Sequence, residues 1–379
     1  MTEATISQLV LNQINIPLKV NFRHASAERN ETSSLWVEAI SESGVSGYGE
    51  SCPRQYVTGE TLDTANTFFS EFCNELCIKI NSLASLKKWM RMHKRELDAN
   101  PAAWCAVELA ILDMLATQQQ KTIESFLDLV PLQGPYQYSA VLGDAKADSF
   151  RASAKQYLDQ GFTDFKLKLS GNLALDQAKL ATMREWDSLD LRVRVDANNL
   201  WGDSEEAISF LRALNYPLFA IEEPLQPDSY SELSDIANAL NCKIILDESF
   251  LRIDQFDSLQ SNSKHWLINL RVSKMGGIFR SLDIIEKSRE LGIGLIVGAQ
   301  VGETSLLTRA GLTLANTAKD ILVAQEGAFG TYLLEHDICD TPLMFGKAGR
   351  LDITKHTILF EPGLGYKLAS KPVYISQLH

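Results

Sequence analysis

The feature that most constrains the fold is a repeat of short apolar strands and helices, which begins after Pro131 and the Gly134-Pro135 break. Repeated strand–helix units imply parallel strands with right-handed crossovers, and about eight such units suit a closed (β/α)8 barrel. An open doubly wound sheet fits less well, because no Gly-x-Gly-x-x-Gly turn follows the first strand. The expected strands span residues 136–141, 164–169, 191–196, 218–222, 243–247, 265–271, 292–297 and 321–324.

The chain before this repeat has a different pattern. Alternating or β-branched residues predict antiparallel strands from Ile6 to Val20 and from Ser34 to Tyr48. Helical periodicity follows over residues 61–80, 85–97 and 102–119. We therefore expect an α/β protein with an α+β capping domain over residues 1–133, a TIM-like barrel over 134–340, and a terminal segment, 341–379, that packs back on the capping domain and completes it.

The charge balance narrows the choice of partner. The formal net charge is -12, whereas nucleic acid or an anionic membrane surface requires clustered Lys and Arg. No apolar run approaches the roughly 20 residues of a membrane span, and the first residues lack a signal-peptide core. The sequence favours a cytoplasmic protein with a small-molecule partner.

Two lysines stand two residues apart within one predicted strand, Phe165-Lys166-Leu167-Lys168-Leu169. Side chains on a strand alternate between faces, so Lys166 and Lys168 point the same way. On a buried face two ammonium groups are unfavourable, because desolvation and mutual repulsion both oppose the charged forms. The alternative is an edge strand whose lysines face water.

Three of the following strands end in carboxylates, Asp196, Glu222 and Asp247, which are 26 and 25 residues apart. One strand–helix unit separates each from the next, so in a barrel they converge at the carboxyl mouth. Three facing carboxylates repel one another unless a cation neutralises them, and oxygen ligands suit Mg²⁺. Each of them could instead cap a helix or lie in a solvated turn.

These motifs, taken in order, resemble the enolase superfamily and in particular its muconate lactonizing enzyme subgroup, which also includes mandelate racemase-like proteins. The matching segments are Lys166-Leu167-Lys168, Asp196-Ala197-Asn198, Ile221-Glu222-Glu223-Pro224, Leu246-Asp247-Glu248-Ser249 and Lys274-Met275-Gly276-Gly277. The resemblance spans nearly the whole chain and implies a capped barrel. The family is often oligomeric, so a homo-oligomer is one expectation.

The resemblance implies a role for each matching residue. Asp196, Glu222 and Asp247 would hold Mg²⁺, which binds a substrate carboxylate and takes up the charge of the enediolate. Lys168 would remove the α-proton. Lys166 would stay charged, lower the pKa of Lys168 and stabilise the enolate oxygen.

The chain departs from the subgroup on the sixth strand, where Arg271 stands in place of a second acid/base lysine. Neutral arginine at pH 7 is unfavourable by roughly 7 kcal/mol, so Arg271 is a poor proton shuttle. The main expectation is one-base isomerisation, cycloisomerisation or β-elimination by Lys168. One alternative is a two-base racemase or epimerase of an amino-acid-like carboxylate, and another is a metal- or ligand-binding relative without turnover.

The remaining assignments concern the surroundings of the mouth. Dipeptide epimerases of the subgroup carry an Asp-x-Asp pair where this chain has Gly327-Ala328-Phe329, which argues against a dipeptide substrate. Asn198 and Glu248 would support the metal ligands, or are ordinary polar strand-end residues. Glu303 either faces the pocket or opens the next helix. Two loops, 22–32 and 52–58, are expected to cover the mouth, and their candidate substrate contacts are Arg23, Arg54 and Tyr56.

Overall fold

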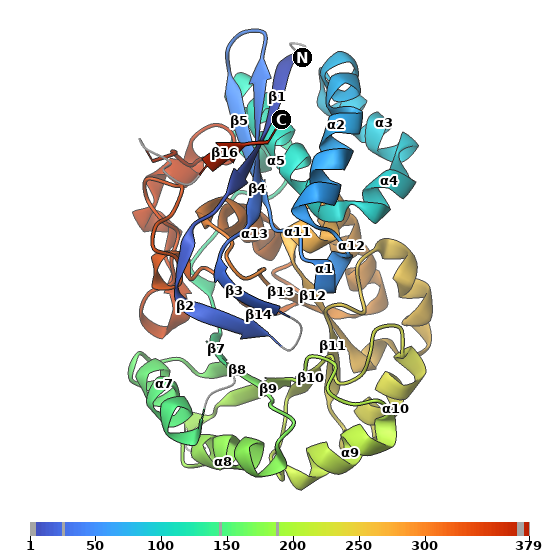
Figure 1. The fold of residues 1–379 in the computed structure, drawn as a ribbon, viewed down its shortest axis with the longest axis vertical. Coiled ribbons are helices and arrows are strands. Elements are labelled where there is room, and N and C mark those ends of the chain that lie inside the picture. The colour runs from blue at the N-terminus through green and yellow to red at the C-terminus, as the bar shows by residue number, and fades with distance from the viewer. Residues whose placement is uncertain (1–4, 25–26, 144–145, 187–188, 370–374, 379) are drawn as a thin grey trace.

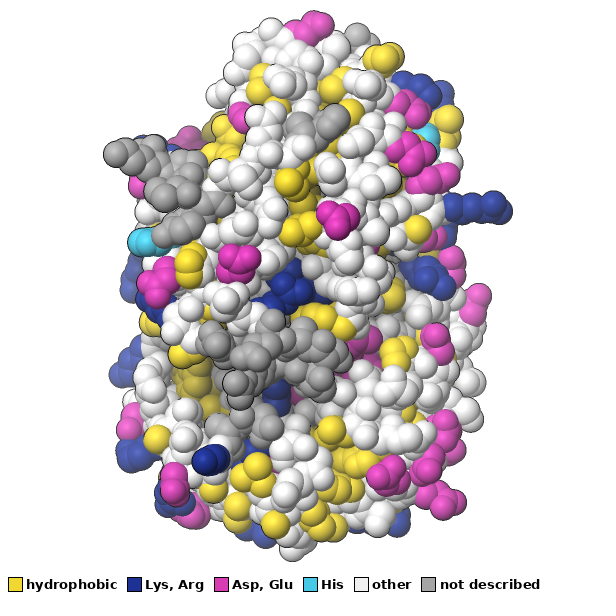
Figure 2. Space-filling view, viewed as in Figure 1, with side chains coloured by type: hydrophobic (Ala, Val, Ile, Leu, Met, Phe, Trp, Pro, Cys, Tyr) yellow, Lys and Arg dark blue, Asp and Glu magenta, His cyan; other side chains and the backbone are white. Residues whose placement is uncertain are grey.

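The computed structural model describes residues 5–24, 27–143, 146–186, 189–369 and 375–378 of the chain. A strand-rich upper part carries the amino-terminal segment, and a barrel lies below it (Figure 1). We call the part formed by β1–β5 and α1–α6 the capping domain. Basic side chains are visible in the recess between the two parts (Figure 2).

An antiparallel sheet in the order β16-β1-β4-β5 forms one layer of the capping domain. Leu11 pairs with Val37 in this sheet, and both side chains are buried. In this order β16, the last strand of the chain, pairs with β1, the first. The strands are β1 (Ile6–Ile14), β2 (Pro17–His24), β3 (Ala27–Glu31), β4 (Ser34–Ser41), β5 (Ser46–Ser51) and β16 (Ile375–Gln377).

Helix α5 (Pro101–Gln118) lies directly against this sheet and is buried along most of its length. The close approach requires glycine, because a side-chain carbon at Gly49 would lie 2.0 Å from the carbonyl oxygen of Ala106. The other helices of the capping domain are α1 (Gln55–Thr58), α2 (Leu62–Lys79), α3 (Leu83–Met92), α4 (Lys94–Ala99) and α6 (Ile123–Phe126).

The barrel is built on an eight-stranded parallel sheet in the order β14-β13-β12-β11-β10-β9-β8-β7. At its seam the Ser139 N–H donates to the Gln325 carbonyl at 2.8 Å. The strands are β7 (Ala140–Leu142), β8 (Asp164–Lys168), β9 (Arg192–Asp196), β10 (Ala220–Glu222), β11 (Lys243–Leu246), β12 (Trp266–Leu270), β13 (Gly294–Val297) and β14 (Leu322–Gln325).

Helices alternate with these strands, as the sequence pattern predicts. Apolar side chains from the five neighbouring strands β10–β14 form a separate buried cluster, which contains Ala220, Ile245, Leu267, Ile296 and Ala324. The helices are α7 (Ala147–Asp159), α8 (Leu173–Arg184), α9 (Ser204–Ala213), α10 (Tyr230–Leu240), α11 (Val272–Met275), α12 (Gly277–Leu291) and α13 (Ser305–Thr317). None of the helices in the described ranges has the length and apolar character to cross a membrane.

Two details of the capping domain differ from the prediction. Residues 22–32, predicted as a loop, are largely strand, because Phe22 of β2 pairs with Arg29 of β3. The predicted loop over residues 52–58 contains the short helix α1. Polar composition had suggested loops in both places, and neither segment has the apolar alternation that marks a strand or helix buried on one side. Residues 25 and 26 lie outside the described residues.

The barrel and the tail are joined by a further short pairing. β6 (Tyr136–Gln137), at the entrance to the barrel, pairs antiparallel with β15 (Arg350–Leu351) from the tail. Short 3-10 helices fill the rest of the loops, at η2 (Ile253–Ser258), η3 (Gln260–His265), η4 (Gly330–Tyr332), η5 (Lys347–Gly349), η6 (Ile353–Lys355) and η7 (Thr357–Phe360).

Candidate active site

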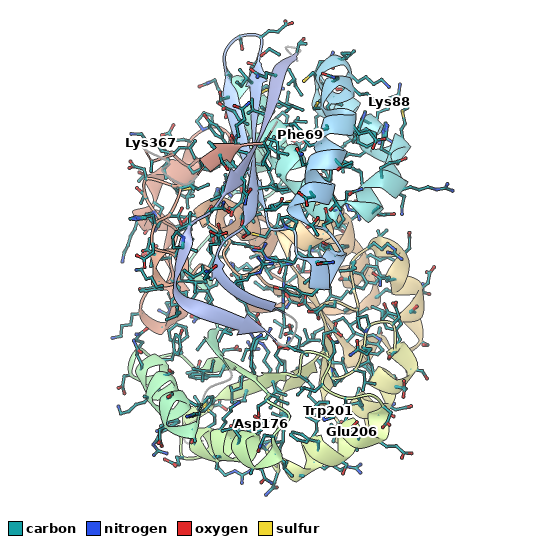
Figure 3. The ribbon with its side chains drawn as sticks, in the orientation of Figure 1. Phe69, Lys88, Asp176, Trp201, Glu206 and Lys367 are labelled. Carbon is teal, nitrogen blue, oxygen red and sulfur yellow. The ribbon has the colours of Figure 1, made fainter. Side chains whose placement is uncertain are left out.

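The two lysines of the sequence motif lie on an interior strand. β8 pairs with β7 on one side and β9 on the other, which rules out the edge-strand alternative. The carboxyl end of β8 is fixed by α8, because Lys179 Nζ of that helix donates to the Lys168 carbonyl at 3.0 Å. Lys179 also pairs with Asp176, which accepts hydrogen bonds from the Ser170 and Gly171 amides. Figure 3 labels Asp176 in the lower part of the molecule.

Lys166 is buried and surrounded by carboxylates. Its Nζ lies 2.7 Å from Glu222 Oε1, 3.2 Å from Asp196 Oδ2 and 3.3 Å from Glu326 Oε2. Burial lowers the pKa of Lys166, but these three carboxylates together raise it above its ordinary value. Lys166 is therefore a fixed positive charge at the centre of the site.

Lys168 has the opposite tendency, although it lies on the same face of the same strand. Its Nζ donates to Asn198 Oδ1 at 3.0 Å, and the Asn198 N–H donates to Asp196 Oδ1 at 3.1 Å. Burial lowers the pKa of Lys168, and the positive charge of Lys166 lowers it further, against the opposing effect of Asp196. A lysine whose pKa is lowered is better suited to act as a base than one with the ordinary pKa.

Asp247, which follows β11, is paired with two cations. Its Oδ1 lies 2.9 Å from Lys274 Nζ, and its Oδ2 forms an ion pair with Arg271 Nη2. Burial raises the pKa of Asp247, but Arg271 and Lys274 lower it to about 2. The carboxyl group of Asp247 is therefore ionised at neutral pH.

Glu222 carries a carboxyl oxygen, Oε2, that is buried and has no hydrogen-bond partner in the described structure. Its other oxygen accepts from Lys166 and from Asn269 Nδ2 at 3.2 Å. Burial raises the pKa of Glu222 to about 8 in spite of the Lys166 charge, and Asp196 contributes in the same direction. Additional positive charge near Glu222 would favour its ionised form.

The residue after Glu222 fixes the geometry of the next strand end. Glu223 Oε1 accepts from the Ser249 N–H at 2.8 Å and from the Asp247 N–H at 2.5 Å, and Glu223 Oε2 accepts from the Ser249 hydroxyl at 2.7 Å. Sequence reasoning quoted Glu223 in a motif but gave it no role. The sequence held one indication of a structural role for Glu223, which is its position between the metal-ligand candidate Glu222 and Pro224.

Cationic side chains occupy the space between the three predicted metal ligands. Among the residues that the structure describes, no group of three or more His, Cys, Asp or Glu side chains is arranged to hold a metal ion. The Lys166 ammonium lies between Asp196 and Glu222, and Arg271 Nη2 contacts Asp247 and lies 3.7 Å from Glu222 Oε1. The donor set is still all carboxylate, and the unpartnered Glu222 oxygen suits a cation, so these residues fit Mg²⁺ chemically.

A cavity of about 260 Å³ opens above these groups. Several of the predicted site residues line it, whereas Glu222 contacts Lys166 without lining the cavity. Apolar side chains including Val141, Phe329 and Leu333 form another part of the wall. The predicted residues in the lining are Tyr56, Lys166, Lys168, Asp196, Asn198, Asp247, Glu248, Arg271 and Glu303.

Arg54 and Arg23 are two predicted substrate contacts from the capping domain, and Arg54 is not among the residues that line the cavity. Arg54 was predicted to contact substrate, but it is buried and donates to the backbone carbonyls of Thr32 at 3.0 Å and Val301 at 2.6 Å. The Arg54 side chain is long enough for its guanidinium to reach both carbonyls, and it thereby joins the capping domain to the barrel. Arg23 lies in β2, and its side chain is outside the described part of the structure.

Glu326 is a residue of the site that sequence reasoning missed. It follows β14, and its carboxylate contacts Lys166 and, at 2.7 Å, Arg194 Nη2. The signal was available, because Glu326 stands at the carboxyl end of its strand, as the three predicted carboxylates stand at the ends of theirs. Gln300 was also missed; its Oε1 accepts from Arg271 Nη1 at 3.0 Å.

Comparison with known proteins places the chain in a family. The family described as enolase C-terminal domain-like matches residues 149–371, which is more than half of the chain. The chain is 29% identical to a hydrophobic dipeptide epimerase from Enterococcus faecalis over 334 residues, which cover 86% of this chain and 91% of that relative. It is 24% identical to an N-succinyl-L-Arg/Lys racemase from Bacillus cereus over 320 residues, covering 83% and 85%.

Solved structures agree on the fold. A dipeptide epimerase from Cytophaga hutchinsonii, complexed with Mg and D-Ala-L-Val, matches with a TM-score of 0.86 at 23% identity over 99% of each chain. The predicted capped barrel and the predicted superfamily are thereby confirmed, whereas the narrower subgroup stays a prediction. The chain belongs to the enolase superfamily and is an isomerase or lyase of that superfamily.

Proposed function

We propose that the protein is a Mg²⁺-dependent enzyme in which Lys168 removes the α-proton of a carboxylate substrate and leaves an enediolate. The observation that carries the proposal is the contrast between two lysines on one strand. Lys166 is held charged by three carboxylates, whereas the pKa of Lys168 is lowered. A catalytic base and a fixed cation side by side are what α-proton removal from a carboxylate requires.

The residues of the chain divide the work as follows. The neutral amine of Lys168 accepts the α-proton, and Asn198 orients that amine through its 3.0 Å hydrogen bond. The Lys166 ammonium stabilises the negative charge that develops on the substrate carboxylate oxygen. Mg²⁺ bound by Asp196, Glu222 and Asp247 would supply Lewis-acid polarisation of the same carboxylate.

The fate of the enediolate depends on the opposite wall of the cavity. Arg271 is held there by Asp247 and Gln300, and its pKa is raised by neighbouring carboxylates in spite of burial. Arg271 is therefore a poor proton donor, and if no other group on this wall supplies a proton, a one-base outcome such as cycloisomerisation or β-elimination follows. Racemisation or epimerisation is the second candidate, supported by the activities of the two relatives and by a carboxyl group, Glu303, on that wall.

Proton exchange at the α-carbon tests the proposal. The protein is incubated with Mg²⁺ and a panel of N-acylamino acids, dipeptides and hydroxy acids in D₂O, and loss of the α-proton signal is followed by NMR. We expect exchange with at least one acid of the panel. A bound carboxylate whose α-proton never exchanges would contradict the proposal and favour a binding protein without turnover.

A further inference from the structure

The wall that carries Arg271 and Glu303 faces the wall that carries the base. Lys168 lies on β8, and Glu303 follows β13; only β14 and β7 separate these strands across the seam. In an eight-stranded barrel that separation is nearly diametric. Lys168 and Glu303 line the same cavity of about 260 Å³, whose size suits one small ligand between them.

Glu303 is held in place by the backbone around it. Its Oε1 accepts from the Gln300 N–H at 2.6 Å, and its own N–H donates to the Gln300 carbonyl at 3.2 Å. Gly302, with φ of +90°, closes this turn against the capping domain, where a side-chain carbon would lie 3.1 Å from Thr32 Cα. The carboxyl group is therefore fixed at the rim between the two parts of the molecule.

A helix-capping role does not account for Glu303. The amides at the start of α13 are taken by other carboxylates, since Glu50 accepts from Thr304 N at 2.9 Å and from Leu307 N at 3.2 Å. Asp337 accepts from Ser305 N at 3.1 Å. Glu303 accepts instead from the loop before the helix and lines the cavity. The choice that the sequence left open is thereby decided by the neighbours of the helix start.

The charges that face Glu303 come from two parts of the molecule. Burial raises the pKa of Glu303 to about 7, and the guanidinium groups of Arg271 and Arg54 oppose this rise. A carboxyl group with this pKa can both donate and accept a proton near neutral pH. Lys168 and Glu248 also line the cavity.

We propose that Glu303 is the second acid/base of the site and protonates the α-carbon on the face opposite to Lys168, so that the enzyme interconverts the two α-configurations of its substrate. The inference rests on the proposed removal of the α-proton by Lys168. In one direction the Cα–H bond breaks and its proton passes to the Lys168 amine. The Glu303 carboxylic acid then gives its proton to the enediolate carbon and becomes a carboxylate. The reverse reaction begins with the Glu303 carboxylate and ends with the Lys168 ammonium as the donor.

If Glu303 is the second acid/base, its loss should impair α-proton exchange of one configuration of the substrate and not of the other. Each base exchanges the α-proton of one configuration only, so Glu303→Gln should lower D₂O exchange by about 10²–10⁴-fold for one configuration. Exchange in the other configuration should stay within a few-fold of the wild type, and conversion between the two should be lost. Glutamine keeps an oxygen that can accept from the Gln300 N–H, and Glu303→Asp should restore part of the exchange.

The experiment uses both α-configurations of N-succinyl-arginine and of the Leu-Tyr dipeptide with Mg²⁺ in D₂O. Glu248→Gln is the matched control, because it removes a carboxyl group from the same cavity, and its effect should be similar for both configurations. Thermal unfolding of each variant excludes a folding defect. An equal effect of Glu303→Gln on both configurations, or wild-type exchange in one configuration only, would overturn the role of Glu303. Wild-type exchange in neither configuration of an acid that binds would instead overturn the proposed function.

Discussion

Glu326 offers a sharp test of the charge network beneath the cavity. Its two oxygens contact different cations, Lys166 at 3.3 Å and Arg194 at 2.7 Å, and all three side chains are buried. Glu326→Gln preserves the shape of the side chain and removes its charge. Both cations keep other carboxylate partners, since Arg194 also pairs with Asp164 and Lys166 with Glu222.

The size of the effect follows from the pKa of the carboxyl group. Burial raises the pKa of Glu326, but Lys166 and Arg194 lower it from 4.5 to about 2. One pKa unit corresponds to about 1.4 kcal/mol, so ionised Glu326 stabilises the fold by about 3 kcal/mol at pH 7. Loss of one partner from a buried ion pair has a similar effect, about 3–5 kcal/mol, and the remaining partners favour the lower end of that range.

The contribution of Glu326 to the free energy of unfolding should decrease as the pH falls. A folded-state pKa below the unfolded one contributes stability that is complete above about pH 4.5 and is lost as the pH falls toward 2. The difference between wild type and Glu326→Gln should therefore shrink to about 2 kcal/mol at pH 3.5.

Urea unfolding followed by circular dichroism at both pH values measures this difference, with the exposed Glu335→Gln as a control. A difference at pH 7 under about 1 kcal/mol, or one that grows in acid, would refute the reasoning.

Two further predictions concern other parts of the molecule. Arg309 of α13 makes a two-point contact with Glu124 of the capping domain, at 2.9 Å for each nitrogen–oxygen pair, and both residues are buried. Arg309→Met should lower the free energy of unfolding by about 3–5 kcal/mol, and the added change Glu124→Leu should restore most of it; no restoration would contradict a charge effect. Mg²⁺ should raise the melting temperature of the wild type, and Asp196→Asn should abolish that rise. An undiminished rise would mean that Asp196 is not a metal ligand.

Much of the barrel and the centre of the site could be predicted because their signals are local. Every second side chain of a strand points to the same face, so Lys166 and Lys168 necessarily lie on one face of β8. The 26- and 25-residue spacing of Asp196, Glu222 and Asp247 follows from the length of a strand–helix unit. Neither argument requires knowledge of distant parts of the chain.

The residues that sequence reasoning missed or misplaced have partners far away in the chain. Glu326 contacts Lys166 from 160 residues away, and Arg54 donates to a carbonyl 247 residues away. The predicted last strand ended at Ala324, whereas β14 extends to Gln325, so that Glu326 directly follows the observed strand. The role of Glu303 was undecided for the same reason, because Glu50 and Asp337 come from other segments to cap α13.

The central claim is that Lys168 removes the α-proton, and the exchange rate of a Lys168→Ala variant tests it most directly. For the configuration that wild-type enzyme exchanges through Lys168, the variant should lose about 10²–10⁴-fold in rate while Mg²⁺ still raises its melting temperature. The wild-type rate should fall in acid as Lys168 becomes protonated, at a pH below the ordinary pKa of lysine. Exchange that survives at the wild-type rate in Lys168→Ala would show that another group is the base.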